Sequence, residues 1–296
     1  MLLPYQTICN RSLSLLPGIR RSVACNYNLI FKNKMSDSAK QELTLVTEKN
    51  GIRRIQLNNP KKHHALSLDL LKSLKSAIEK ESDGKPPHVI VICSSGKVFS
   101  AGHDLRELTD ATGHDYHKDI FDACTKVMQL IQDTEVPVIA EVNGLATAAG
   151  CQLVASCDVV IASESSRFAT PGVNVGLFCS TPAVALARAV PRKLAMQMLL
   201  TGEAITAQEA LKHGLVSKVV PHEELETETT RIAEKISSSS RSVMALGKAC
   251  FYKQIQKSRD EAYSYASDAM LRNLNYDDCQ EGINAFVDKR QPVWKD

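Results

Sequence analysis

Two short segments rich in small residues have the composition needed to present backbone N–H groups to a ligand. They are residues 98–105 (VFSAGHDL) and residues 143–152 (NGLATAAGCQ), and each follows an apolar run. Small side chains let a ligand approach the backbone closely, and the start of a helix adds a partial positive charge. Two such junctions that converge on one point form an oxyanion hole, which stabilises a carbonyl oxygen as it gains negative charge. Either segment alone is more typical of an ordinary tight turn, whereas the pair is a more specific signal.

The apolar runs before these segments predict the strands that position them. Residues 89–93 form a continuous β-branched run, and residues 137–142 and 158–162 are similar. Such runs are typical of strands that are buried on both faces. Helical patterns lie between them, which predicts an α/β fold with parallel pairing and right-handed crossovers.

The part of the chain before this core carries local turn and cap signals. The Asn50-Gly51 pair separates two short strand candidates, residues 43–47 and 52–57, and therefore predicts a hairpin. Ser67 stands at the N-cap position of a helix that should run to about Lys80.

The last third of the chain has a different pattern. From about Thr206 the sequence is almost entirely helical in pattern, and the polar residues 237–240 mark a joint. The final helices carry an apolar stripe, which needs either the main core or another subunit as its partner surface. The stripe consists of Ala262, Tyr265, Ala266, Ala269, Met270 and Leu274.

The N-terminus has the composition of a targeting segment. The first 34 residues contain five Arg and Lys residues, and the first acidic residue is Asp37. Arg with Ser and scattered Leu and Ile, without acids, is typical of a mitochondrial transit peptide, which we predict for residues 1–36. The alternative is that residues 1–36 form a basic, disordered tail without a targeting role. The mature protein is then expected in the mitochondrial matrix.

Composition narrows the classes of partner. The 296 residues are 44% hydrophobic and 23% charged, which fits one substantial core of one or two domains. The net charge of +3 and the lack of basic blocks interleaved with aromatics argue against nucleic-acid binding. The seven cysteines after the presequence show no CxxC spacing, so we expect reduced, mostly buried thiols and no metal site. No apolar run is long enough to predict a transmembrane helix.

A series of motifs, taken together and in this order, resembles the crotonase (enoyl-CoA hydratase/isomerase) family. The similarity covers roughly residues 42–292. Its main elements are residues 99–104 (FSAGHD), 137–140 (PVIA), 143–144 (NG), 150–153 (GCQL), 157–158 (CD), 168–176, 200–203 (LTGE), 207–210 (AQEA), 214–216 (GLV) and 281–290. The resemblance implies an α/β fold, a ClpP-like spiral of ββα turns, here residues 40–240. It also implies a C-terminal helical region, residues 241–296, that supports homotrimers or hexamers.

The family resemblance also implies a site for an acyl-CoA thioester, with no cofactor beyond this ligand. By position, the backbone N–H groups of Ala101 and Ala149 would form the oxyanion hole. Ala101, Gly102, His103 and Asp104 would border the adenine and pantetheine. Lys61 and Lys62 match a basic stretch that lies near the CoA phosphates in the family. Lys289 matches a C-terminal lysine that can reach the CoA of a neighbouring subunit. The alternative for all three is a solvated surface lysine without a role in binding.

Departures from the family pattern lie at the residues that would handle protons. A family hydratase activates water with two glutamates, and the corresponding positions here are Gln152 and Gly172. Glutamine can orient a water but cannot accept its proton at neutral pH, and glycine has no side chain. The position of the isomerase acid is Ser180, and Ala149 stands where the family usually has glycine.

Other polar residues near the motifs have simpler interpretations. His63 and His64 are adjacent in sequence, so their side chains should diverge, which argues against a pair of metal ligands. His64 stands where the family commonly has Asn. We expect His103 to flank CoA without proton transfer, and Asp104 to satisfy N–H groups of its own turn. Glu141 could point towards the pocket or away from it.

Three functions remain open on these grounds. The first is an enzyme that stabilises a thioester enolate and catalyses a reaction other than efficient hydration. The second is a binder of acyl-CoA without catalysis, and the third is a weak hydratase or isomerase in which Gln152 positions water. Fatty-acid and lipid metabolism is the setting that the resemblance and the presequence suggest together.

Overall fold

The computed structural model describes residues 42–81 and 84–295, so the predicted transit peptide lies outside the described residues. The first described elements form the predicted hairpin. Strands β1 (Thr44–Lys49) and β2 (Ile52–Leu57) pair antiparallel, with Lys49 opposite Ile52. Asn50 and Gly51 have φ angles of 53° and 74°, as a tight two-residue hairpin turn requires.

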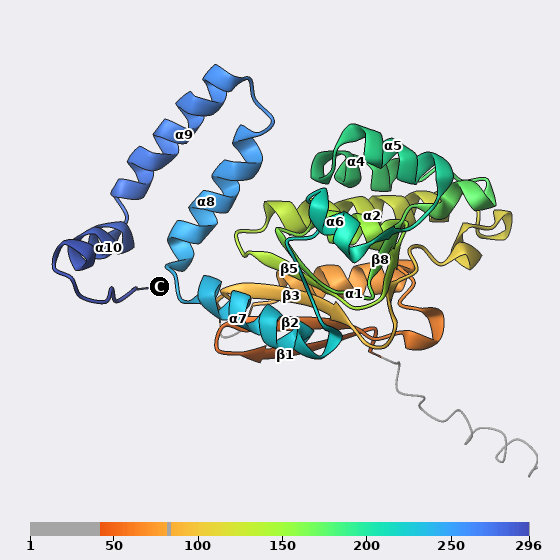
Figure 1. Cartoon of the computed structure of the whole chain (residues 1–296), viewed down its shortest axis with the longest axis horizontal. Helices are drawn as coiled ribbons and strands as arrows, with labels where there is room; N and C mark the ends of the chain where they lie inside the picture. The colour runs from red at the N-terminus through yellow and green to blue at the C-terminus, as the bar shows by residue number, and fades with distance from the viewer. Residues whose placement is uncertain (1–41, 82–83, 296) are drawn as a thin grey trace, which may run out of the picture. The chain divides into compact units, whose positions relative to one another are not determined.

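A six-stranded sheet forms the centre of the fold (Figure 1), in the order β1-β2-β3-β5-β7-β10. Strands β3 (Val89–Ser94), β5 (Val138–Val142) and β7 (Val159–Ser163) coincide with the three predicted β-branched runs, and every neighbouring pair after β1-β2 is parallel. After Thr206 the described chain is almost entirely helical, as predicted, apart from the unpredicted strand β10 (Lys218–Val220), which pairs with β7. Its three residues are too few to show a strand pattern.

A second, four-stranded sheet, in the order β4-β6-β8-β9, is built from the segments that follow the central strands. Strand β4 (Val98–Ser100) follows β3, β6 (Leu145–Thr147) follows β5, and β8 (Arg167–Ala169) follows β7; β9 (Ile205–Thr206) completes the sheet. A helix comes after each of these strand pairs: α2 (His114–Asp133), α3 (Ala149–Ser156) and α4 (Ser180–Ala189). The repeated unit is therefore ββα, which confirms the predicted spiral.

Helices cover both faces of the central sheet. On one face Ile90 and Ile92 pack into the main core with α1 (Leu68–Glu79), α2 and α3, and on the other Val89 and Val91 pack against α7 (Leu225–Ser237). The continuous apolar run of β3 is thus explained by burial on two sides. The predicted N-cap of α1 is confirmed, because the Ser67 side chain accepts a hydrogen bond from the N–H of Leu70.

The remaining described helices complete the chain. They are α5 (Arg192–Thr201), α6 (Ala207–Lys212), α8 (Arg241–Gln254), α9 (Arg259–Leu274) and α10 (Asp277–Val287), with short 3-10 helices η1 (Pro60–Lys62), η2 (Leu105–Leu108), η3 (Asp110–Thr112), η4 (Pro171–Val175) and η5 (His222–Glu224). The division at residue 240 into core and C-terminal region stays a prediction.

A polar cluster around Lys248 attaches helix α8 to the core. The Lys248 ammonium, 7% exposed, donates to a carboxylate oxygen of Asp158 at 2.7 Å and to the backbone carbonyls of Ile131, in α2, and Val136, which follows α2. Tyr252 donates to the other Asp158 oxygen at 2.7 Å. Beyond this attachment α9 and α10 expose apolar side chains, including Met270 at 63% and Phe286 at 86%. Such exposure is compatible with a partner subunit, which stays a prediction.

The described residues also bear on the predictions about cysteines, metal-binding groups and membrane-spanning helices. Its seven cysteines are free and five of them are buried. Residues 42–81 and 84–295 contain no group of acidic, His and Cys side chains able to hold a metal ion. Within the same residues no helix is both long and apolar enough to cross a membrane.

Candidate active site

The two small-residue segments meet at the start of helix α3. A Cβ atom placed on Gly102, whose φ is 81°, would lie 2.8 Å from the Ala148 Cβ and 3.1 Å from the Ala149 nitrogen. A Cβ on Gly150 would lie 2.5 Å from the carbonyl oxygen of Ser100. Glycines at both positions therefore allow the backbones to touch, and the structure brings the predicted segments together.

Ala149 is the first residue of α3, and its N–H has no acceptor among the described residues. The preceding residue, Ala148, has φ 48° and ψ −119°, a sparsely populated conformation that turns the chain from β6 into the helix. An N–H in the first turn has no acceptor within its own helix. No other acceptor within residues 42–81 and 84–295 is bonded to the Ala149 N–H.

The N–H of Ala101, the second predicted donor, is already hydrogen-bonded. Its N–H donates to the carbonyl oxygen of His63 at 3.0 Å. His63 and His64 have φ angles of 51° and 50°, so the segment that supplies this carbonyl is in the left-handed region twice in succession. The site thus has one free donor and one donor that is already bonded.

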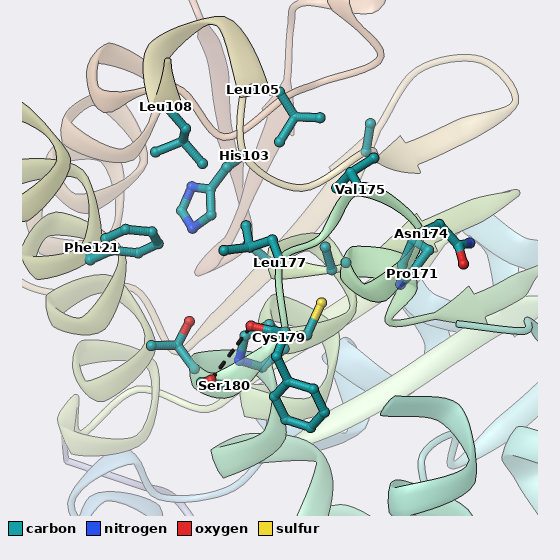
Figure 2. A pocket seen from close by; sticks show the side chains of 17 residues that line it. His103, Leu105, Leu108, Phe121, Pro171, Asn174, Val175, Leu177, Cys179 and Ser180 are labelled. Atoms are coloured by element: carbon teal, nitrogen blue, oxygen red, sulfur yellow. Dashed lines mark hydrogen bonds between the residues drawn. The ribbon is translucent and has the colours of Figure 1, made fainter. Parts of the chain in front are cut away.

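A cavity of about 470 Å³ adjoins Ala101 and Ala149. Most of its wall is hydrocarbon, and Figure 2 shows Leu105, Leu108, Phe121, Val175 and Leu177 around it. The remaining lining residues are His103, Ala148, Pro171, Gly172, Asn174, Phe178, Cys179, Ser180, Thr181 and Pro182. A volume of this size is in the usual range for small-molecule sites.

Among the described residues that line the cavity, His103 contributes the one imidazole. Its Nδ1 lies 3.2 Å from the carbonyl oxygen of Leu66, and its ring meets that of Phe121 edge to face, with centroids 5.4 Å apart. Burial lowers the pKa of His103 below its ordinary value, so the ring is neutral at pH 7. Its Nε2 is buried and has no partner among the described residues.

Gln152 is buried but does not line this cavity. Its side chain faces α2, where Cys124 Sγ lies 4.0 Å from its Oε1, and it borders a separate polar groove with Gln129, Gln132 and Arg188. The predicted role of Gln152 as a degenerate acid position stays a prediction.

At Gly172, the second hydratase position, there is no room for a side chain. A Cβ there would lie 2.1 Å from the carbonyl oxygen of Leu177 and 2.8 Å from the Cys179 sulfur. The N–H of Leu177 in turn donates to the Gly172 carbonyl at 2.9 Å. The backbone after η4 therefore folds over the position that a second glutamate would need.

Of the predicted CoA-binding residues, Lys62 and Asp104 lie together beside the small-residue turn, where Arg106 joins them. Asp104, 6% exposed, accepts hydrogen bonds from the Arg106 N–H and from the Arg106 side chain at 2.9 and 3.0 Å, and its Oδ2 lies 3.2 Å from the Lys62 ammonium. Chiefly because of Arg106, the pKa of Asp104 is lowered to about 2. Lys61 and Lys62 are exposed in η1, while Lys289 follows α10. None of these lysines lines the cavity.

One histidine, His64, and one carboxylate, Glu141, have structural explanations. His64 is buried, accepts a hydrogen bond from the Asn59 N–H at Nδ1, and lies 3.0 Å from the Ser95 carbonyl through Nε2. It therefore holds the η1 segment in place. Glu141 points away from the cavity and pairs with Arg54 at 2.6 Å.

Sequence reasoning missed most of the apolar lining. Leu105, Leu108 and Phe121 come from η2 and α2, and Leu177 and Phe178 from the turn before α4. The available signal was the largely apolar stretch Val175 to Phe178, which begins three residues after Gly172.

The repeated ββα units, with a helix start facing an apolar cavity, define the crotonase class of fold. The profile of the enoyl-CoA hydratase/isomerase family matches residues 47–296. The chain belongs to this family. It is 63% identical over 252 residues to the mitochondrial enoyl-CoA hydratase domain-containing protein 3 of Mus musculus, covering 85% of this chain and 84% of that protein.

Solved structures agree with this assignment. The crystal structure of human enoyl coenzyme A hydratase domain-containing protein 3 superposes with a TM-score of 0.84 at 61% identity, over 85% of this chain and 100% of that one. An enoyl-CoA hydratase of Mycobacterium smegmatis has a TM-score of 0.82 at 43% identity, over 86% and 99%.

Proposed function

We propose that this chain binds an acyl-CoA thioester, with the acyl group in the apolar cavity and the thioester oxygen at the Ala149 N–H, and that it does not hydrate enoyl groups efficiently. One observation carries the proposal: the Ala149 N–H, which has no acceptor among the described residues, borders a cavity whose wall is mostly hydrocarbon. An N–H aimed at a carbonyl oxygen stabilises negative charge there, and the apolar wall excludes water.

The arrangement around Gly172 supports the second half of the proposal. General acid and base help is worth about 10²- to 10⁴-fold in rate. Gln152 faces another groove, and the Leu177 carbonyl occupies the space beside Gly172, so neither hydratase position offers a carboxylate to the cavity. Binding without catalysis, or enolate chemistry with another base, fits these positions better than hydration does. A weak hydratase remains the second candidate.

The setting of this activity is part of the same proposal. Relatives are named mitochondrial, and the basic, acid-free N-terminus supports import into the mitochondrial matrix. The exposed apolar side chains of α9 and α10 support assembly into a homotrimer or hexamer. CoA phosphates would contact Lys61 and Lys62, and Lys289 would contact the CoA of a neighbouring subunit.

Titration calorimetry with saturated acyl-CoA thioesters of increasing chain length tests the proposal. Burying one methylene contributes about 0.8 kcal/mol, so affinity should rise about fourfold per added carbon until the cavity is full. Leu108→Phe narrows the cavity and should lower the chain length at which the rise stops. Leu200→Phe, on an exposed position of α5, is the matched control. An affinity independent of chain length would contradict the proposal.

A further inference from the structure

The ring of His103 is fixed in one orientation and one tautomer. It follows Gly102 in the small-residue turn, and its Nδ1 lies 3.2 Å from the Leu66 carbonyl oxygen. A carbonyl oxygen can only accept, so Nδ1 carries the hydrogen. In a neutral ring Nε2 is then a bare acceptor. Contact with Phe121 holds the ring plane from the side.

This Nε2 is the unusual atom of the cavity. It is buried and has no hydrogen-bond partner among the described residues. Figure 2 shows the His103 ring directed into the space between Phe121 and Leu177. A buried acceptor without a partner is costly, and most buried polar atoms in native structures have a hydrogen-bond partner.

The character of the cavity restricts what could satisfy this acceptor. The surrounding Leu105, Leu108 and Leu177 side chains are apolar, so a cationic donor would lose its hydration without compensation. Thiols are weak donors. A hydroxyl group on an otherwise apolar chain supplies a donor and leaves the rest of the ligand against hydrocarbon.

We propose that His103 is a specificity-determining residue whose Nε2 accepts a hydrogen bond from a hydroxyl group on the bound acyl chain. This inference rests on the proposed function, because it assigns the acyl group to the same cavity. A site that hydrogen-bonds a hydroxyl discriminates strongly against the ligand that lacks it, since the acceptor is then left unpaired. The lowered pKa of the ring keeps the acceptor available at neutral pH.

Titration calorimetry with matched pairs of acyl-CoA thioesters tests the inference. The members of a pair have equal chain length and differ only in a hydroxyl at carbon 2, 3 or 4. At one of these positions the hydroxylated member should bind about tenfold tighter. In His103→Phe, which keeps an aromatic ring and removes the acceptor, this preference should fall to about twofold or less. His222→Phe, an exposed histidine of η5, should leave the preference unchanged.

A spectroscopic measurement on the unaltered protein gives a second test. In protein labelled with ¹⁵N-histidine, the signal of the bare Nε2 of His103 should move upfield on addition of the preferred hydroxylated thioester and stay in place with its unsubstituted partner. A hydroxyl preference that survives in His103→Phe, or equal affinities at all three positions, overturns the inference while leaving acyl-CoA binding intact. Failure of every thioester to bind overturns the proposed function, and the inference with it.

Discussion

The carbonyl oxygen of His63 accepts a hydrogen bond from the backbone N–H of Ala101, with an N–O distance of 3.0 Å. This contact joins the segment after η1 to the turn after β4, and it uses one of the two N–H groups assigned to the oxyanion hole. His63 reaches this position with φ of 51°, a conformation that costs about 1 kcal/mol or more for a residue other than glycine. A ligand that recruits both donors must therefore displace a carbonyl held in a strained segment.

Nuclear magnetic resonance of the two amides tests whether both donors are used. With the protein saturated by an acyl-CoA that has no double bond in its acyl chain, the N–H signals of Ala101 and Ala149 should both shift, because Ala149 gains the thioester carbonyl as an acceptor and Ala101 exchanges the His63 carbonyl for it. The amide of Ala233, buried in α7 on the far side of the central sheet, should not. A shift at Ala149 alone would mean that the His63 bond persists and that the site works with one donor. No shift at either amide in the bound state would contradict the site.

Substitution of Gly172 should disturb the fold rather than restore hydration. The Leu177 carbonyl stands 2.1 Å from where a Cβ would be, so Gly172→Ala should destabilise the protein by about 1–3 kcal/mol. Gly172→Glu should give no gain in hydratase rate. Thermal unfolding is the measurement. Gly247→Ala, on a helical position with nothing within 4 Å, should be neutral or slightly stabilising. An unchanged melting temperature for Gly172→Ala would show that the Leu177 backbone moves easily.

Loss of Lys248 should weaken the attachment of α8. Its buried ammonium bonds to Asp158 and to two carbonyls, and removal of one partner of a buried pair typically costs about 3–5 kcal/mol. Lys248→Met keeps most of the side-chain volume and should lower the free energy of unfolding in urea by this amount. Lys253→Met, on the exposed side of α8, should change it by less than about 0.5 kcal/mol. Equal effects of both variants would refute the attachment.

Because of Asp104, the free energy of unfolding should depend on pH in the acid range. Its pKa is lowered to about 2, chiefly by the hydrogen bond from the Arg106 side chain. A carboxyl whose folded pKa lies below its ordinary value contributes stability that is complete above the ordinary value and is lost as pH falls towards the folded value. Between about pH 4 and pH 2 the wild type should therefore lose stability more steeply than Asp104→Asn. Denaturant unfolding across this range, with exposed Asp110→Asn as control, measures the difference. Parallel curves for wild type and Asp104→Asn would contradict it.

The parts of this structure that local sequence signals encode were predictable. The Asn50-Gly51 turn, the Ser67 cap and the buried runs of β3, β5 and β7 each depend on residues that are close in sequence. The motif pair correctly predicted that residues 98–105 and 143–152 come together. β10 was missed because three residues carry too little pattern.

The state of the site depends on contacts between distant residues, which composition and spacing do not encode. The acceptor for the Ala101 N–H comes from His63, and the obstruction at Gly172 comes from the backbone of Leu177. Sequence placed Gln152 near the reaction centre by family position, whereas its side chain faces α2. The Nε2 of His103, which has no partner within the part of the chain that the structure describes, is left as an acceptor because Nδ1 meets the Leu66 carbonyl.

The central claim is that the chain binds acyl-CoA thioesters but does not hydrate them efficiently. The most direct test is titration calorimetry of the purified protein with crotonyl-CoA and longer enoyl-CoAs, with hydration followed in the same samples by loss of the conjugated thioester absorbance. We predict saturable binding that strengthens with chain length. We also predict a hydration rate at least about 10²-fold below that of an enzyme that has general acid and base catalysis. Rapid hydration would contradict this account, because a residue other than Gln152 and Gly172 would then have to activate the water.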